Sequence, residues 1–382
     1  MKIWFEGVPF EANNFFSRSE LKPIHPFLHP VFEFWTFWNS EEKTWMAHTS
    51  GSTSEPKKIA ISRAQIEVSA KATLEFFKLD SESDGLVLCL SASHIGGLMI
   101  LARAFLGNLD LLILAPSSNP LPENEPVLCK RKWFISLVPP QMDALLGSVS
   151  LIRNSGFWKG ILLGGASVSG SLIQKLKKLK CPVYQSYGMT ETVSHIAIRT
   201  IHFPENPNFR PEVDYTVLPN ILIRQNESDC ICIKGEVTQN QWIETKDQIQ
   251  RINLKSFHLI GRIDDIVNSG GLKINPSEIK QFLQEEPLLH EVQFELLGIK
   301  DDLLGQKLVL VFQENLSEDL INPLFWKTLI DTLKSSIDSK KLPKAVFSVK
   351  EFPKTESQKL NKPLLISLLG SSLPVWKNPH FS

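Results

Sequence analysis

The strongest constraint on the fold is an alternation of strand-like and helix-like segments between residues 62 and 187. Short apolar runs alternate there with longer segments in which apolar residues recur at helical spacing. The predicted strands are residues 85–90, 110–115, 133–138, 160–163 and 183–187, and the predicted helices are residues 62–77, 94–105, 141–149 and 169–179. This order predicts an α/β domain with a mostly parallel sheet covered by helices, in which ligands bind beyond the carboxyl ends of the strands.

The pattern changes after about residue 217, where the expected strands become shorter. Residues 259–274 are rich in charge and glycine, and a helix is expected to begin after Asn275. We therefore expect a large N-terminal domain, residues 1–262, and a small mobile α+β domain, residues 263–382. The elements expected in the small domain are a helix to about 285, a hairpin across 300–305, a helix over 323–337 and a strand from 345.

The composition argues against several function classes. The 41 basic and 41 acidic residues cancel, so no net charge attracts nucleic acid or a membrane surface. No apolar run reaches transmembrane length, and residues 1–10 lack the pattern of a signal peptide. The five cysteines are scattered, and Cys230 and Cys232 alternate along an expected strand, which indicates packing in a reducing compartment. We expect a cytoplasmic protein whose aromatic, proline-rich residues 1–43 form an edge or a cover of the large domain.

A polar loop, Thr49-Ser50-Gly51-Ser52-Thr53-Ser54-Glu55-Pro56-Lys57, follows a short strand-like run. Gly51 can take a positive φ and lets the backbone approach a ligand, and the hydroxyl and N–H groups of such a turn donate to an anion. Lys57 adds a positive charge. These features favour phosphate binding, although the loop lacks the Gly-Lys-Ser/Thr pattern of the Walker motif. The alternative is an ordinary polar turn between two elements.

Two further glycine-containing turns stand at the expected carboxyl ends of strands. One is Gly164-Gly165-Ala166, and the other is Tyr187-Gly188-Met189-Thr190-Glu191. In isolation, the first is equally compatible with a plain strand-to-helix turn, and Thr190 and Glu191 also suit the first turn of a helix. Their shared position at one edge of the sheet favours a ligand site.

Together these stretches resemble the acyl-adenylate-forming enzymes, which include acyl-CoA synthetases, peptide-synthetase adenylation domains and luciferases. Four segments occur in that family's order: the loop ending in Pro56-Lys57, the Tyr-Gly-Met-Thr-Glu run, the segment Gly261 to Asp265 and the segment Pro353 to Lys359. The resemblance implies a requirement for ATP, Mg²⁺ and coenzyme A. A carboxylate would attack the α-phosphate of ATP to give an acyl-adenylate and pyrophosphate, and the thiol of coenzyme A would then displace AMP.

The resemblance assigns the nucleotide to the large domain. The polar loop would hold the β- and γ-phosphates, the Gly-Gly-Ala turn would lie along the adenine with Tyr187 against its face, and Thr190 would bond the α-phosphate. Glu191 would bind Mg²⁺, which prefers carboxylate and phosphate oxygens. Asp247 would accept the ribose hydroxyls, and Arg262 would reach the ribose or a phosphate. The nucleotide set is Thr49, Ser50, Gly51, Ser52, Thr53, Lys57, Gly164, Gly165, Ala166, Tyr187, Gly188, Asp247 and Arg262.

The same resemblance assigns the change between the two steps to the small domain. Asp264 would be the hinge about which this domain turns, and Gly270 and Gly271 would line the tunnel for coenzyme A, where side chains would obstruct. Lys359 would enter the site for adenylation and stabilise charge on the α-phosphate and the attacking carboxylate. The alternative is a solvated lysine on a mobile loop. The expected catalytic set is Thr190, Glu191 and Lys359.

Several features depart from the family pattern. Ser54, Lys246 and Gln358 stand where the family usually has glycine. Ser54 keeps the loop polar at a cost in flexibility, and Gln358 changes how Lys359 is presented. The phosphate loop also comes early in the chain, so we expect the first lobe of the large domain to be much reduced.

Within the family, the early loop and the run from Gly188 to His195 most resemble the o-succinylbenzoate–CoA ligases of menaquinone biosynthesis. That acid has an aromatic ring and two carboxylates, of which one reacts, so its pocket needs apolar walls and a cation. We expect His94, His195 and Arg199 to bind the acid. Each is also compatible with a core or surface residue whose hydrogen bonds are satisfied.

Other functions stay open at this point. One is a coenzyme A ligase for another aryl or acyl acid, or an adenylation domain that loads a carrier-protein thiol. An amino-acid substrate would need an acidic partner for its amine, and the sequence identifies none. The other is a non-catalytic protein that holds an adenylate, in which Ser54 and Gln358 mark lost catalysis.

Overall fold

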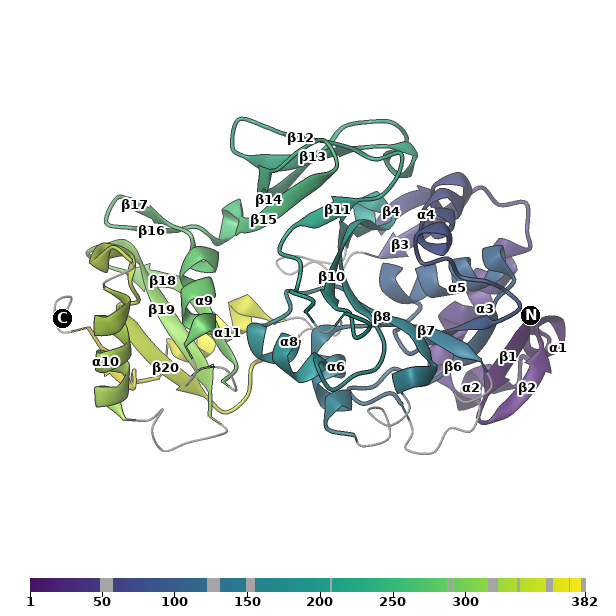
Figure 1. The fold of residues 1–382 in the computed structure, drawn as a ribbon, viewed down its shortest axis with the longest axis horizontal. Helices are drawn as coiled ribbons and strands as arrows, with labels where there is room; N and C mark the ends of the chain where they lie inside the picture. Colours follow the sequence, from purple (N-terminus) through teal and green to yellow (C-terminus); the bar gives the residue numbers. More distant parts are fainter. Residues whose placement is uncertain are drawn as a thin grey trace.

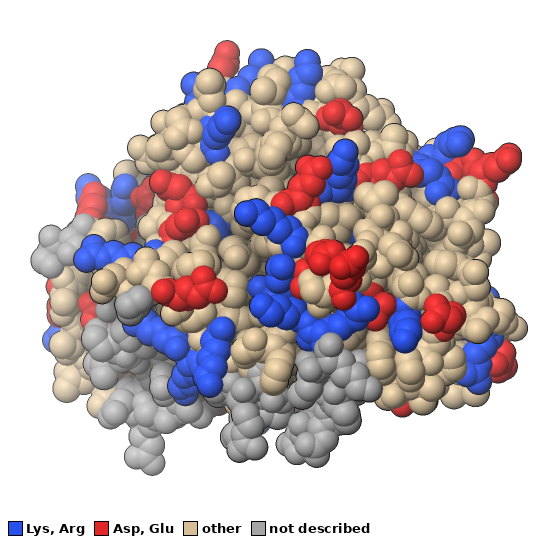
Figure 2. Space-filling model, turned by 45° about the vertical axis from the view of Figure 1, so that its right-hand side comes forward, with Lys and Arg blue, Asp and Glu red and all other residues tan. Residues whose placement is uncertain are grey.

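The computed structural model of this chain describes residues 1–48, 58–121, 131–148, 155–206, 208–286, 289, 292–314, 322–334, 337–354, 360–370 and 372–378. Their strands form a large sheet of 13 strands, a smaller sheet of 6 strands and a hairpin of 2 strands (Figure 1). None of the described helices is long and apolar enough to cross a membrane. Basic and acidic side chains are interspersed over the face shown in Figure 2, in keeping with their equal numbers.

One part of the large sheet is parallel, as the alternation predicted. Its strands are, in spatial order, β1 (Lys2–Phe5), β6 (Asp110–Ile113), β5 (Asp84–Leu88), β7 (Lys132–Leu137), β8 (Trp158–Leu163) and β9 (Val183–Met189). Parallel neighbours need a crossover connection, and helices supply several of these connections here. The carboxyl ends of β7, β8 and β9 therefore meet at one edge of the sheet.

Helices cover both faces of this parallel part. On one face α3 (His29–Trp38), α4 (Arg63–Phe76) and α5 (Ile95–Gly107) share a core with Leu86 and Leu88 of β5. On the other face α6 (Pro139–Leu146) and α8 (Gly170–Leu176) share a core with Val87. Successive residues of a strand point to opposite faces, so β5 contributes to both cores. Helix α6 begins two residues earlier than expected, since proline is favoured in a first turn.

Beyond β9 the large sheet continues with antiparallel strands, most of which the sequence did not reveal. They are, in spatial order, β10 (Ser194–His202), β11 (Tyr215–Val217), β15 (Ser256–Arg262), β14 (Ile243–Arg251), β13 (Cys230–Lys234) and β12 (Leu222–Gln225). This extension lies at the top of Figure 1 and has a separate apolar core that includes Tyr187, Tyr215 and Phe257.

The N-terminal residues form an edge and a cover, as expected. Strand β1 joins the parallel sheet, β2 (Val8–Glu11) pairs with it antiparallel, and α1 (Ala12–Phe16) and α2 (Leu21–Ile24) lead to α3. Aromatic rings fill the space beneath this cover. The rings of Phe16 and Trp35 stack with centroids 4.3 Å apart and an interplanar angle of 8°.

The two-stranded hairpin stands next to α4. Its strands, β3 (Thr44–His48) and β4 (Lys58–Ser62), pair antiparallel as far as His48 and Lys58. Ser62 ends β4 and caps α4: its Oγ accepts from the backbone N of Gln65, whose side chain accepts from the backbone N of Ser62. The polar loop expected to grip phosphate connects these strands and lies outside the described residues.

The small sheet has its own helices and its own core. Its strands are β17 (Leu272–Ile274), β16 (Val267–Ser269), β19 (Gly305–Gln313), β20 (Ala345–Val349) and β21 (Trp376–Lys377) in spatial order, with β18 (Phe294–Asp301) paired to β19. Helices α9 (Pro276–Glu285) and α10 (Pro323–Leu333) pack on one face, and α11 (Lys362–Leu369) packs on the other. The large sheet ends at Arg262 and the small sheet begins at Val267; a domain boundary after residue 262 stays a prediction.

Candidate functional site

The two glycine-containing turns of the large sheet lie side by side. Strands β8 and β9 pair with Leu163 opposite Gln185, so the turn after β8 stands next to the end of β9. Gly165 has φ +81°, a conformation that L side chains rarely adopt. A Cβ atom on Gly164 would lie 2.9 Å from Ser186 Oγ, which is closer than real Cβ contacts. The backbone conformation therefore favours glycine at position 165, and a side chain at position 164 would have to displace the Ser186 hydroxyl.

The second turn is held by a close backbone contact. Gly188 pairs with His195, and a Cβ atom on Gly188 would overlap the carbonyl oxygen of Ser194 and the Cα of His195. Backbone atoms on a neighbouring strand cannot move aside, so only glycine fits. After the turn, Val193 has φ +52°, which is a strained conformation for a β-branched residue.

Thr192 fixes the short 3₁₀ helix Thr190–Thr192 in this turn. Its buried hydroxyl accepts from the backbone N of Met189 at 3.0 Å and donates to the carbonyl oxygen of Ser194 at 2.8 Å. The helix holds Glu191 with its side chain exposed to solvent and Thr190 half-buried beside it. The turn is thus shaped by the protein's own contacts, and strain of this kind is characteristic of functional sites.

Asp247 contacts two other expected nucleotide residues. Its Oδ2 accepts from the Tyr187 hydroxyl at 2.7 Å, and its Oδ1 accepts from Arg262 Nη1 at 2.8 Å. Strands β14 and β15 place Asp247 directly opposite Arg262. Burial, reinforced by the Asp247 carboxylate, raises the pKa of Tyr187 well above its usual value, so the hydroxyl stays protonated and donates. The structure therefore brings Tyr187, Asp247 and Arg262 together.

His195 lies in a buried polar cluster between α4, α5 and β10. Its Nε2 is 3.1 Å from Thr73 Oγ1, and its Nδ1 is 3.3 Å from Ser194 Oγ. Burial and the nearby positive charge of Arg103 lower the pKa of His195 well below 6.5, so the imidazole is neutral near pH 7. The cluster consists of Thr73, Arg103, Ser194 and His195.

Arg103 is the most unusual member of this cluster, and the sequence reasoning missed it. The residue is 3% exposed, its Nη2 donates to Ser194 Oγ at 3.2 Å, and among the described residues its Nε has no partner. Burial lowers its pKa to about 9, which leaves the guanidinium charged at neutral pH. No carboxylate of the described residues pairs with it. The one sequence feature that could have indicated a buried charge is that Arg103 is the single charged residue in the otherwise apolar run Gly97 to Leu106.

Arg199 and His94 lie apart from this cluster. Arg199, also on β10, donates to Gln185 Oε1 on β9 and to the carbonyl oxygen of Val213. The structure therefore does not bring Arg199 and His195 into one pocket. His94 occupies the N-cap position of α5, without a side-chain capping hydrogen bond, whereas Arg103 stands near the C-terminal end of the same helix.

The segment between the two sheets, which includes the expected hinge Asp264, carries two neighbouring acidic residues with different partners. Asp264 lies within 3.1 Å of Lys246 Nζ and 3.5 Å of Arg262 Nη2, both on the large sheet. Asp265 lies 2.5 Å from Lys362 Nζ, at the start of α11. Further along, Gly270 and Gly271 form the turn between β16 and β17, with φ of +57° and +83°.

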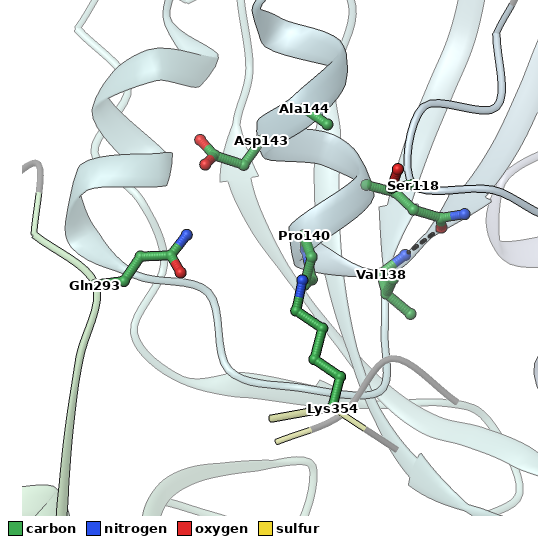
Figure 3. Close-up of a pocket in the computed structure, with 8 residues that line it drawn as sticks. Ser118, Val138, Pro140, Asp143, Ala144, Gln293 and Lys354 are labelled. Carbon is green, nitrogen blue, oxygen red and sulfur yellow. Dashed lines mark hydrogen bonds between the residues drawn. The ribbon is translucent and has the colours of Figure 1, made fainter. Parts of the chain in front are cut away.

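A small pocket lies between α6 and the small domain. It has a volume of about 200 Å³ and its lining includes Val138, Pro140, Gln293 and Lys354. In Figure 3 the Lys354 side chain reaches toward Pro140, at the start of the helix that follows β7. Lys354 also forms an isolated antiparallel β-bridge with Leu360. Gln358 and Lys359 lie outside the described residues. The polar loop Thr49 to Lys57 also lies outside them.

Two sequence comparisons bear on this site. The family model described as AMP-binding enzyme matches residues 37–225. The 2-succinylbenzoate–CoA ligase of Bacillus cytotoxicus is 26% identical over 351 residues, which cover 84% of this chain and 69% of that protein.

Solved structures are similar as well. An acyl-CoA synthetase (AMP-forming)/AMP-acid ligase II-like protein from Dyadobacter fermentans is 33% identical, with 90% of this chain and 95% of that chain covered and a TM-score of 0.56. The o-succinylbenzoate coenzyme A synthetase from Bacillus subtilis, solved with ATP and a magnesium ion, is 22% identical. The match covers 84% of this chain and 69% of that one with a TM-score of 0.64, which shows a shared fold.

Proposed function

This chain belongs to the AMP-binding, adenylate-forming acid–CoA ligases, and on that premise we propose that its acid is o-succinylbenzoate, as in menaquinone biosynthesis. In the first step an oxygen of one carboxylate attacks the α-phosphorus of ATP and pyrophosphate leaves. In the second step the sulfur of coenzyme A attacks the acyl carbon of the adenylate and AMP leaves. The products are o-succinylbenzoyl-CoA, AMP and pyrophosphate.

Arg103 carries the choice of acid. A buried guanidinium that lacks a counter-ion costs folding free energy, and such charges are normally paired. Within the described residues Arg103 has only the Ser194 hydroxyl as a partner, while its Nε is left without an acceptor. A dicarboxylic acid that reacts through one carboxylate has a second carboxylate to offer. We propose that this second carboxylate pairs with Arg103.

The surroundings of Arg103 suit such a ligand. His195 is neutral and lies beside Ser194, so it can exchange hydrogen bonds without adding a second charge. The flanking residues of α5 are apolar and buried, which suits an aromatic ring. We retain His195 as an acid-binding residue and His94, at the other end of α5, as a second one.

The nucleotide residues keep the roles that the resemblance implied, as proposals. The Gly164–Ala166 turn and Tyr187 would contact the adenine, and Asp247 and Arg262 would hold the ribose. The described residues contain no group of three metal-ligating side chains, so Mg²⁺ would be held by Glu191 together with phosphate oxygens and water. The exposed Glu191 carboxylate fits that arrangement. When bound, Mg²⁺ neutralises negative charge on the phosphates of ATP.

The small domain would serve both steps. We propose that Asp264 is the hinge, that Lys359 stabilises charge in the first step, and that Gly270 and Gly271 border the path of coenzyme A in the second. The position of Lys354 supports this proposal, because Lys354 lines a pocket together with Val138 and Pro140, just beyond the carboxyl end of β7.

A panel of acids tests the proposal. ATP–pyrophosphate exchange should be fastest with o-succinylbenzoate and much slower with 4-oxo-4-phenylbutanoate, which lacks the ring carboxylate. Arg103→Met should remove that preference, a loss of roughly 1.5–3 kcal/mol for a charge-assisted hydrogen bond. Arg251→Met is the control, because Arg251 is exposed at the end of β14.

Each other outcome points to a different function. Exchange with another acid, and none with o-succinylbenzoate, would reject the proposed substrate. If the protein catalyses exchange, forms no thioester with coenzyme A and instead transfers the acyl group to a carrier protein, it is an adenylation domain. Binding of AMP with no exchange for any acid would indicate a non-catalytic adenylate-binding protein.

A further inference from the structure

We infer that Arg199 is a positioning residue that holds both walls of the adenine pocket, and that it does not bind the acid. The inference rests on the proposed function, because the adenine is assigned to the Gly164–Ala166 turn and Tyr187 there. It replaces the role expected for Arg199 from the sequence alone. The reason is the set of partners that the side chain already has.

The first wall is linked to Arg199 through Gln185. Arg199 donates from Nε at 2.9 Å and from Nη2 at 2.6 Å to the same oxygen, Gln185 Oε1. Gln185 is 3% exposed, and its Nε2 donates to the carbonyl oxygen of Ala166 at 3.2 Å. One buried amide therefore connects the guanidinium to the turn that would lie along the adenine.

The second wall is linked to Arg199 through Tyr215. The Arg199 Cζ lies 5.1 Å from the centroid of the Tyr215 ring, within the range of a cation–π interaction. Tyr215 stacks on Phe257 with centroids 5.5 Å apart, and both rings contact Tyr187 at 5.9 and 5.3 Å. The ring that would face the adenine thus packs against Tyr215 and Phe257, and Arg199 covers the Tyr215 ring.

These contacts leave Arg199 little to offer a substrate carboxylate. Its remaining terminal nitrogen, Nη1, donates to the carbonyl oxygen of Val213 at 3.0 Å. Arg103 differs in this respect, since its Nε has no described partner. A planar guanidinium can bond Gln185 through two nitrogens while stacking on Tyr215, which a lysine ammonium cannot do. Without Arg199, Gln185 Oε1 is buried and unsatisfied, and the amide is free to turn away from Ala166.

The test measures nucleotide binding without any acid. AMP is titrated by calorimetry into the wild-type protein and into Arg199→Met, with Arg199→Lys as the conservative variant. We expect Arg199→Met to weaken AMP binding about tenfold, the size of one hydrogen bond to a charged group, and Arg199→Lys to recover part of that loss. The preference for AMP over inosine monophosphate should fall in parallel, because a displaced Gly164–Ala166 turn contacts the adenine less specifically.

A matched control and a second variant test the chain of hydrogen bonds from Arg199 through Gln185 to Ala166. Arg224→Met removes another arginine that stacks on an aromatic ring, with its Cζ 4.5 Å from the Trp242 centroid, and should leave AMP binding unchanged. Gln185→Met should reproduce the loss of Arg199→Met. The double variant should lose no more than either single variant, since the two residues act in series.

The outcomes separate this inference from the proposed function. If wild-type protein binds no AMP, the proposed function fails. If wild-type protein binds AMP and a folded Arg199→Met binds it equally well, the inference is overturned while the function stands. The same holds if Arg199→Met keeps its base preference and only its Michaelis constant for the acid rises. Melting curves show which variants are folded. If Arg199→Met is not folded, the AMP affinity of Arg199→Lys decides whether Arg199 positions the adenine pocket.

Discussion

Lys246 and Asp264 form an ion pair, with 3.1 Å between Nζ and Oδ2, that ties β14 of the large sheet to the proposed hinge. The neighbouring Asp265 pairs instead with Lys362 of α11. Two consecutive acidic residues are therefore tied to opposite bodies of the molecule. A rotation about Asp264 would have to break or stretch the Lys246 pair, whereas the Lys362 pair would travel with the small domain.

We predict that Lys246→Gln speeds the thiol step relative to adenylation. Both partners are partly exposed, so the pair contributes roughly 0–1 kcal/mol and the ratio of the two rates should change by no more than about fivefold. Salt should raise the same ratio in the wild-type protein and have less effect in the variant. Pyrophosphate release and thioester formation are measured at several salt concentrations, with Lys273→Gln as a control exposed on β17. An equal salt response in wild type and variant would show that the pair does not restrain the domain.

Lys359→Ala should remove most adenylation and spare much of thioester formation from preformed acyl-adenylate. The proposed role places one positive charge at the reacting phosphate in the first step only, and the loss of such a charge costs on the order of 3 kcal/mol. Both half-reactions are measured separately, with the exposed Lys350→Ala as the control. Large and equal losses in both would argue against the assignment.

Arg103→Met should increase the stability of the ligand-free protein while it weakens binding of the acid. The variant removes a buried charge that lacks a described carboxylate partner and replaces it with an apolar side chain of similar length. The melting temperature is measured with and without o-succinylbenzoate. The acid should stabilise the wild-type protein and leave the variant unaffected. A variant that is destabilised yet still stabilised by the acid would show that Arg103 is a structural residue.

The stability of the fold should depend on pH through His195. Its folded pKa lies well below 6.5, so the unfolded chain binds a proton at a higher pH than the native protein does. This contribution is fully present above about pH 6.5 and is lost as the pH falls below it, at up to about 1.4 kcal/mol per pH unit. His195→Gln should flatten the decline of melting temperature between pH 7 and 5, and the exposed His29→Gln should not. An unchanged slope in His195→Gln would refute the assignment.

The sequence predicted every strand of the parallel part of the large sheet except β1, because each of the others is a short apolar run next to a helical pattern. Strand β14 has no such pattern: in Ile243-Glu244-Thr245-Lys246-Asp247 exposed residues alternate with half-buried ones, four of the five are polar, and the strand is paired on both sides. The expected helices and strands around the small sheet were found, since its hairpin and helices carry local turn and cap signals. Pairing partners in the antiparallel extension depend on contacts that no local pattern contains.

The sequence indicated several candidate residues that the structure brings together, such as Tyr187 and Asp247, but it gave no sign that His195 and Arg199 lie apart. Arg199 follows His195 by four positions, so a regular strand would place both on one face. The pairing shifts between them, because His195 faces Gly188 whereas Ala197 faces Tyr187. That extra residue turns the two side chains to opposite faces. Arg103 was missed because a single charge in an apolar helix gives no motif.

The strained turn after Gly188 has a consequence for binding kinetics. Val193 holds a positive φ and Thr192 secures the turn in the ligand-free chain, so the protein itself supplies the shape that the nucleotide meets. No slow rearrangement of this turn then precedes association. Rapid mixing with AMP should give one phase whose rate rises linearly with AMP concentration, and a rate that levels off would reveal a gating step. The nucleotide would bind to a preformed turn, and diffusion would limit the rate of association.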